Sequence, residues 1–328
     1  MKGLIWLTWR QHRWPILVSA AITAILTTYM LITATQLAHL VTACANATCD
    51  RSTLASTPSH ATYAMNTLEF LPVLVAVFWG VPLLAREYEQ RTLALAWSQD
   101  VSRHRWLIGK TAIMTVLVGA MAAILAAASG YLAREFHAFT GASLFEGTAY
   151  QAGGWLPLTL SLAWLTFGIA AGAMTRRTMP AIALVAAAWF GSQIALMPRL
   201  RPHFMTPVTG ALPLTEPGNV MDLTQIGPNG GIYVDAHGTR YTADQLMTTC
   251  SDALGAHRAP GVSGGPVITT QTTCEQKLGI IGQLSTYQPA SRLGDFHLID
   301  SGINLTLLAV SLLAAWWCVH RTRTTTSA

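Results

Sequence analysis

The chain has 328 residues, of which 52% are hydrophobic and 11% are charged, and its mean hydropathy is +0.39. In a soluble domain about a quarter of the residues are usually charged, so this composition excludes an ordinary soluble globular protein and indicates a membrane protein. The formal net charge is +5 and the pI is near 9.1, so the distribution of the charges decides whether nucleic acid is a partner.

Six apolar stretches are each long enough to cross a bilayer, whose hydrocarbon core of about 30 Å needs about 20 helical residues. The first stretch is too long for the apolar region of a signal peptide and no small-residue cleavage site follows it, so we expect it to be retained. The predicted spans are Pro15–Gln36, Thr67–Ala85, Trp106–Leu132, Trp155–Thr175, Met179–Met197 and Gly302–Val319.

Residues 1–14 combine tryptophans with basic residues, a pattern typical of a short helix lying in the cytoplasmic interface of a membrane. Pro15 would mark the bend into the first span. The alternative is a simple basic flank ahead of a transmembrane helix.

The second span contains Glu69, and an ionisable group inside a span is a candidate for a transport pathway. Because Glu69 lies near the outer end of the span, access to interfacial water is the simpler alternative. Pro72 and Pro82 in the same span predict kinks.

The loop of residues 86–105 carries dense charge. Glu87 and Arg91 are four residues apart, in the favourable order for a helical ion pair, and Leu93 and Trp97 would share one apolar face. The pattern predicts a short amphipathic helix suited to a groove on a partner protein. An ordinary basic loop is the alternative.

Small residues favour close helix packing in the third and fourth spans, for example in the stretch from Gly168 to Gly172. After the fifth span, residues 198–301 are the part of the chain available for a water-facing fold. Prolines make its beginning extended or looped. Further on, we expect a hairpin within residues 231–242, a helix from Thr242 or Asp244 to Leu254, and a second helix over Thr273–Leu284.

The basic residues give the orientation, because Lys and Arg are retained on the cytoplasmic side. Segments 1–14, 86–105, 176–178 and 320–328, together with Lys110, hold 12 of the 20 Lys and Arg residues but only 3 of the 15 acidic ones. Both termini are therefore expected in the cytoplasm of a multi-pass plasma-membrane protein. This segregation explains the high pI without nucleic acid.

Four cysteines fall on the outer side in this topology, where the environment of a bacterial-type membrane is oxidising. They allow three pairings, of which the local one, Cys44–Cys49 with Cys250–Cys274, is the simplest. The second bond would staple the two helices of the outer domain. Free thiols or metal ligands are the alternatives, although the histidines show no HxxxH or HxH spacing that would support a metal site.

The charged loop also carries a motif of the form Glu-x-Glu-x-Arg-Thr, followed by Ser-Arg-x-Arg-x-x-x-Gly-Lys. With this motif, six spans and a large outer loop before the last span, the chain resembles the permease subunit of an ABC-2-type ABC transporter. The outer segment from Tyr287 to Arg292 is similar to actinobacterial members of this group. The matching residues are Glu87, Glu89, Arg91, Thr92, Ser102, Arg103, Arg105, Gly109 and Lys110.

In that family, the loop after the second span contains a coupling helix that docks on the ATP-binding subunit. The family more commonly has Gly where this chain has Arg91. The resemblance implies a coupling role for Glu87, Glu89, Arg91, Leu93, Trp97, Arg103 and Arg105.

Gly109-Lys110-Thr111 imitates the end of a Walker A loop, but the first glycine of that motif would have to be His104. We therefore expect no nucleotide-binding domain, cofactor or metal in this chain. ATP and Mg²⁺ would bind to a separate ATP-binding subunit.

These observations predict an all-α membrane protein with six transmembrane helices and a small disulfide-stapled α+β extracytoplasmic domain. Its parts would be residues 1–14, spans and coupling loop within 15–197, the outer domain 198–301, the last span 302–319 and the tail 320–328. The resemblance implies an exporter that works with an ATP-binding subunit and a second permease copy or homologue in the lipid bilayer. Because the spans offer almost no charge for gripping a small ion or a sugar, a lipophilic or amphipathic substrate (antibiotic, peptide or lipid) is favoured.

The alternative from another class is a membrane sensor or assembly anchor that binds a ligand with its outer domain. An intramembrane enzyme is disfavoured, because the spans hold no paired acid and base or metal constellation.

The topology can be tested with Ser263→Cys, which should react with a membrane-impermeant thiol reagent in intact cells because residues 198–301 are expected outside. Ser98→Cys should react only after the cells are opened. The mass shift of each variant is compared with that of the parent protein. Reversed labelling would contradict the orientation and every assignment made from it.

Overall fold

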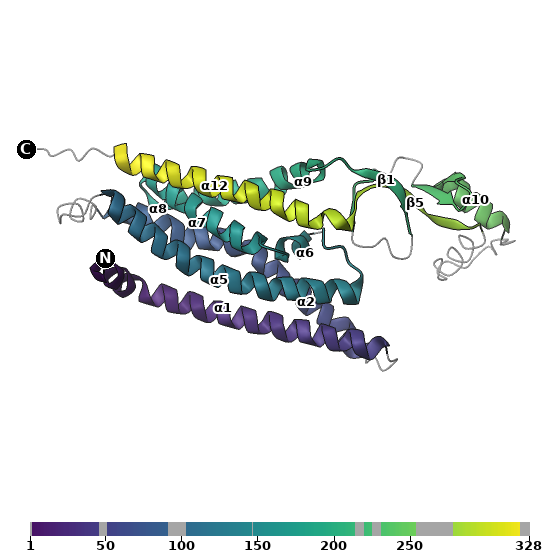
Figure 1. The fold of residues 1–328 in the computed structure, drawn as a ribbon, viewed down its shortest axis with the longest axis horizontal. Coiled ribbons are helices and arrows are strands. Elements are labelled where there is room, and N and C mark those ends of the chain that lie inside the picture. The colour runs from purple at the N-terminus through teal and green to yellow at the C-terminus, as the bar shows by residue number, and fades with distance from the viewer. Residues whose placement is uncertain are drawn as a thin grey trace, which may run out of the picture. The chain divides into compact units, whose positions relative to one another are not determined.

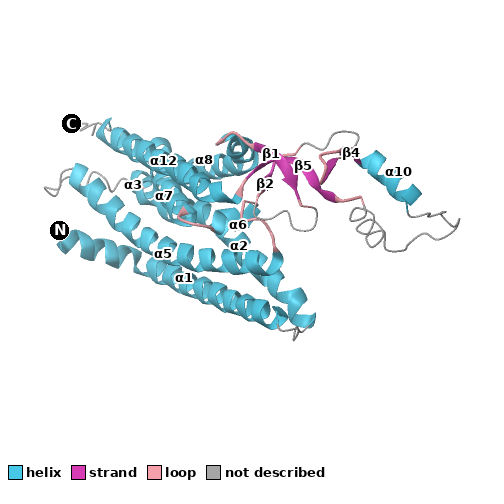
Figure 2. Cartoon of the chain, turned by 45° about the vertical axis from the view of Figure 1, so that its right-hand side comes forward, coloured by secondary structure: helices cyan, strands magenta, loops and turns pink. Residues whose placement is uncertain are grey.

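In the computed structural model, the chain forms two compact units (Figures 1 and 2). The helical bundle comprises Met1–Arg201 and Leu293–Ala328, and the sheet unit comprises Pro202–Arg292. The structure describes residues 2–45, 51–90, 103–145, 147–213, 220–224, 231–253 and 278–321.

Six helical stretches of the described chain are long and apolar enough to cross a membrane, which confirms the predicted number. Several extend beyond the predicted apolar cores. The last helix, for example, begins at Leu293 because Phe296 and Asp300 pack inside the bundle and continue the buried face. The helices that form these spans are α1 (Lys2–Ala45), α2 (Arg51–Val75), α3 (Val81–Glu89), α5 (Arg103–Thr140), α7 (Leu156–Thr175), α8 (Thr178–Gly191), α9 (Met197–Leu200) and α12 (Leu293–Arg321).

Two spans are interrupted by a turn of π-helix. The turn η1 (Ala76–Gly80) separates α2 from α3, and η2 (Ser192–Leu196) separates α8 from α9. Pro72 lies four residues before η1 and Pro82 lies in the first turn of α3, so the π turn falls between the two prolines. In the first span, by contrast, α1 continues through Pro15.

Helix α7 is the central helix of the bundle. The apolar part of this span is 83% buried inside the bundle, compared with 17% for the span that contains α8. A Cβ added to Gly168 would lie 2.5 Å from the carbonyl oxygen of Ala76, and one added to Gly172 would lie 2.7 Å from that of Val81. The predicted close packing at these glycines is confirmed, and α7 touches η1 and α3 backbone to backbone.

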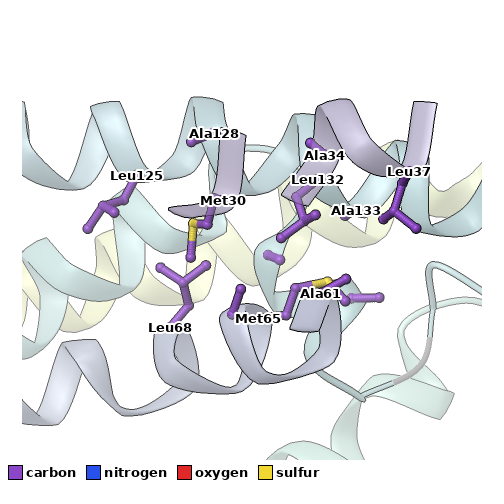
Figure 3. Packing of buried hydrophobic residues seen from close by; sticks show 13 residues of the cluster. Met30, Ala34, Leu37, Ala61, Met65, Leu68, Leu125, Ala128, Leu132 and Ala133 are labelled. Atoms are coloured by element: carbon purple, nitrogen blue, oxygen red, sulfur yellow. The ribbon is translucent and has the colours of Figure 1, made fainter. Parts of the chain in front are cut away.

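Among the described residues of the bundle, two apolar clusters join the helices. One joins α1, α2, α5 and the short helix α6 (Gly147–Ala152), with Met30, Met65 and Leu132 among its fully buried side chains (Figure 3). The other joins α3, α5, α7 and α12 around Leu84 and Leu165. Together they tie the peripheral helices to the centre.

The sheet unit is built on a long central strand, β5 (Ile280–Gln288), which pairs antiparallel with three other strands. The predicted hairpin and the first predicted helix are confirmed, and Figure 2 shows both in this unit. The remaining elements are β1 (Val208–Leu212), β2 (Met221–Asp222), β3 (Ile232–Asp235), β4 (Arg240–Thr242), α10 (Ala243–Ala253) and the 3₁₀ turns η3 (Arg201–His203) and η4 (Ala290–Arg292).

The second predicted helix, Thr273–Leu284, is wrong over residues 280–284, which belong to β5. Residues 273–277 lie outside the described part of the chain. The correction has a physical reason, because Ile280 and Ile281 have β-branched side chains that favour a strand, and β5 has hydrogen-bonded neighbours on both sides.

The β3–β4 turn is organised by Asp235. Its Oδ1 atom accepts hydrogen bonds from the backbone N–H groups of His237 (2.9 Å) and Thr239 (2.7 Å). Burial alone would raise the pKa of the Asp235 carboxyl, but these hydrogen bonds outweigh it and hold the pKa below its ordinary value. The carboxylate therefore stays charged and keeps the turn closed at neutral pH.

The cysteines are only partly described. Cys44, near the end of α1, is disulfide-bonded, and its partner lies outside the described side chains. Cys49 and Cys274 lie outside the described residues, as does the side chain of Cys250. The Cys250–Cys274 staple therefore stays a prediction.

The close contact of α7 with η1 and α3 predicts different effects for two glycine substitutions. Gly168→Ala should destabilise the bundle by about 1–3 kcal/mol, because the new methyl group would overlap the Ala76 carbonyl. Gly130→Ala in α5 meets nothing within 4 Å and should be neutral or slightly stabilising. Thermal unfolding of both variants in detergent would measure the difference. Equal melting temperatures would contradict the close contact.

Candidate functional site

The predicted coupling residues that the structure describes, Glu87, Glu89, Arg103 and Arg105, lie at one end of the bundle, here named the loop end. It comprises the end of α3, the start of α5 and the turn between α7 and α8. Arg91, Leu93 and Trp97 lie outside the described residues. Arg103 is the first residue of α5, and Arg105, two residues further on, is exposed. The structure therefore shows the frame from which residues 91–102 leave and to which they return.

One side of this frame is an ion pair between α3 and α5. The Nζ atom of Lys110 donates to the Glu87 carboxylate, and the side chains are only 7% and 15% exposed, respectively. Lys110 also lies 5.1 Å from the ring centre of Trp106. Breaking a shielded pair of this kind leaves an uncompensated charge, so the contact holds the end of α3 to the start of α5.

The other side of the frame joins α3 to α8. Both oxygens of the exposed Glu89 carboxylate accept hydrogen bonds from Thr178, one from the backbone N–H at 2.7 Å and one from the hydroxyl at 2.8 Å. Thr178 is the first residue of α8, whose own N-cap residue, Arg177, makes no capping hydrogen bond. Glu89 therefore supplies the missing cap and places a negative charge at the positive end of the helix.

A cation–π contact reinforces the same junction. The guanidinium of Arg176 lies 5.6 Å from the ring centre of Tyr88. Arg176 has a φ of 54°, which turns the chain from α7 into α8. The end of α3 is thus joined to the turn between α7 and α8 through two neighbouring residues, Tyr88 and Glu89.

Glu87 and Glu89 reach different neighbours because they are two residues apart on a helix, a rotation of about 200°. Glu87 faces α5 and Glu89 faces α8. The structure pairs Glu87 with Lys110, the last residue of the same motif. The predicted pair of Glu87 with Arg91 stays a prediction, because Arg91 lies outside the described residues. A lysine in an apolar stretch requires an acidic partner, and that signal was present in the sequence.

A second charged cluster lies at the opposite end of the bundle. Oδ2 of Asp300 accepts hydrogen bonds from the Tyr150 hydroxyl and from Nε of Arg201, each at 2.9 Å. These residues come from α6, η3 and α12. Their type and spacing gave no sign of the cluster, because 51 to 150 residues of sequence separate them.

Ring contacts accompany this cluster. The Arg201 guanidinium lies 4.6 Å from the Tyr150 ring centre, and the His297 ring lies 4.7 Å from the same centre. Burial and the neighbouring Asp300 carboxylate raise the pKa of the Tyr150 phenol, so it remains a proton donor. Glu69, the predicted pathway residue, is half-buried on α2 and is not part of the cluster.

The described residues hold no group of three or more His, Cys, Asp or Glu side chains that could bind a metal ion. Residues 19–201 match a family model described as "ABC-2 membrane transporter related". No curated protein matches the chain. The matched region covers more than half of the chain and includes Glu87, Glu89, Lys110 and Thr178.

The Asp300 cluster yields a test of its own. Arg201→Met should destabilise the protein by about 3–5 kcal/mol, because it leaves the Asp300 carboxylate buried without its cation. Adding Asp300→Asn removes that charge, so the double variant should unfold at a higher temperature than Arg201→Met alone. The exposed Arg240→Met is the control and should change stability little. A double variant less stable than Arg201→Met would contradict the pairing.

Proposed function

The chain belongs to the ABC-2 membrane transporter related family, and from this premise we propose that it is the membrane-spanning permease subunit of an ATP-driven exporter. The family match and the six apolar helices make it a multi-pass membrane protein and a transport component. The export direction, the ATP-binding partner and the substrate are the parts that we propose.

The observation that carries the proposal is the frame at the loop end. Residues 91–102 begin and end on helices that are held in place by Glu87 and Glu89, the two acids of the motif. A segment mounted on fixed helices can pass a push from a docked protein into the bundle. The partner would be an ATP-binding subunit that carries the ATP and Mg²⁺.

The distribution of charge supports a cytoplasmic loop end. Arg105, Arg176, Arg177 and Arg321 are exposed there, and Lys and Arg are retained on the cytoplasmic side of membranes. In this orientation, both termini are cytoplasmic and the sheet unit is extracytoplasmic.

The apolar character of the spans supports a lipophilic or amphipathic substrate, such as an antibiotic, a peptide or a lipid. The described charges inside the bundle at Lys110 and Asp300 are already paired, with Glu87 and Arg201. Large apolar side chains are exposed along α1, α8 and α12. These faces would meet lipid and a second permease copy or homologue, with which the chain would form the translocation path.

The second candidate function, a membrane sensor or assembly anchor, rests on the sheet unit, which forms a compact unit of its own. A sensor would bind its ligand there and would not stimulate an ATPase. The two functions therefore differ in one measurable property.

Trp97→Ala should weaken binding of the ATP-binding subunit about thirtyfold, because a buried aromatic anchor in an interface is worth about 2 kcal/mol or more. Trp155→Ala is the matched control, since Trp155 is 67% exposed at the start of α7, away from the loop end. Co-purification of the subunit and its ATP hydrolysis are measured, with permease melting temperature as the folding control. If Trp97→Ala binds and stimulates as the parent does, the coupling assignment fails and the sensor gains support.

A further inference from the structure

The Glu89–Thr178 contact leads to an inference that rests on the proposed function and deepens it. We propose that Glu89 is a positioning residue of the coupling segment, whose carboxylate fastens the end of α3 to the first turn of α8. In this role Glu89 influences the ATP-binding subunit through its contact with Thr178, and it does not touch the ATP-binding subunit itself.

The first argument is the geometry of the contact. Glu89 is the last residue of α3, directly ahead of the Gln90 C-cap and of residues 91–102. Both of its carboxylate oxygens are engaged by a single residue, Thr178. A two-point contact fixes the direction of the carboxylate as well as its distance, and therefore fixes the end of the helix that carries it.

The second argument is that α8 depends on this contact for its cap. Its N-cap residue, Arg177, is extended and its side chain makes no capping hydrogen bond. The hydroxyl of Thr175, in the preceding turn, is engaged with backbone groups of Ala171 and Arg177. The first N–H of α8 is thus satisfied from another helix, which makes the start of α8 follow the end of α3.

The third argument is that α3 is held to its neighbours at both of its ends. Gly172 brings α7 against the backbone of Val81 at the start of α3. Val81 and Glu89 are eight residues apart, or about 12 Å along the helix axis. Helix α3 is therefore held to the α7–α8 hairpin at two levels, and a push on residues 91–102 would move the three helices as one body.

A partner-independent measurement tests the contact itself. Gln90→Cys and Arg177→Cys, one beside each end of the contact, are combined in a Cys318→Ser background and joined with a short bifunctional maleimide in membranes. Glu89→Ala should slow crosslinking about fivefold, the factor that loss of one helix N-cap represents. Thr178→Ser keeps both donors and should crosslink like the parent. Unchanged crosslinking in Glu89→Ala would overturn the proposal.

A second measurement distinguishes positioning from direct contact with the ATP-binding subunit. If Glu89 acts through Thr178, then Thr178→Val should reduce the stimulation of ATP hydrolysis, and Glu89→Ala together with Thr178→Val should reduce it no further than Glu89→Ala alone. Additive losses, or a silent Thr178→Val, would assign Glu89 to the partner and overturn the inference. Thr178→Ser should retain the parent's stimulation.

The two arms separate this inference from the proposed function. The crosslinking arm requires no ATP-binding subunit, so its failure counts against the Glu89 contact alone. If crosslinking responds as expected but Trp97→Ala leaves ATP hydrolysis unchanged, the contact is real and the coupling function is wrong. Crosslinking that responds while Glu89→Ala leaves stimulation unchanged would reject the positioning role.

Discussion

Direct backbone contact between α7 and the η1–α3 stretch is the constraint on which the bundle depends. In a bilayer, helices gain little from hiding apolar side chains, because the lipid is equally apolar, so close approach and dispersion decide the packing. Gly168 and Gly172 permit that approach. With α7 held at the centre, α5 and α12 pack on its remaining faces through the second apolar cluster.

The charged residues follow from the same constraint. Once the helices are fixed, each charge inside the bundle must find a partner on a neighbouring helix, since a lone buried charge is costly. Lys110 finds Glu87 at one end and Asp300 finds Arg201 at the other. Both pairs therefore fix relations between helices: α3 with α5 in the first case, and η3 with α12 in the second.

The apolar pattern was sufficient to predict the six spans, because span length and hydropathy are local properties of the sequence. The β3–β4 hairpin and α10 also follow local signals, which are turn residues and a helix start. The helix predicted over Thr273–Leu284 failed over residues 280–284 because strand pairing with β1 and β3 is non-local. Pairing with neighbouring strands decided the conformation of Ile280 to Leu284, which the local sequence pattern had predicted as helix.

The candidate site shows the same division. Residue type identified Glu87, Glu89 and Lys110 as members of one motif, but their partners depend on the fold. Thr178 is 89 residues from Glu89, and no spacing rule links them. The Asp300 cluster was missed altogether, since Tyr150, Arg201 and Asp300 come from three separate elements.

The π-helical turn η1 sets the rotational phase of everything that follows it in the second span. A π turn accommodates one residue more than the α-helix it interrupts, and each residue of an α-helix turns the chain by about 100°. Deleting a single residue within Ala76–Gly80 would make the helix regular. Glu87 and Glu89 would then swing away from Lys110 and Thr178, so the length of this turn specifies which helices α3 can address.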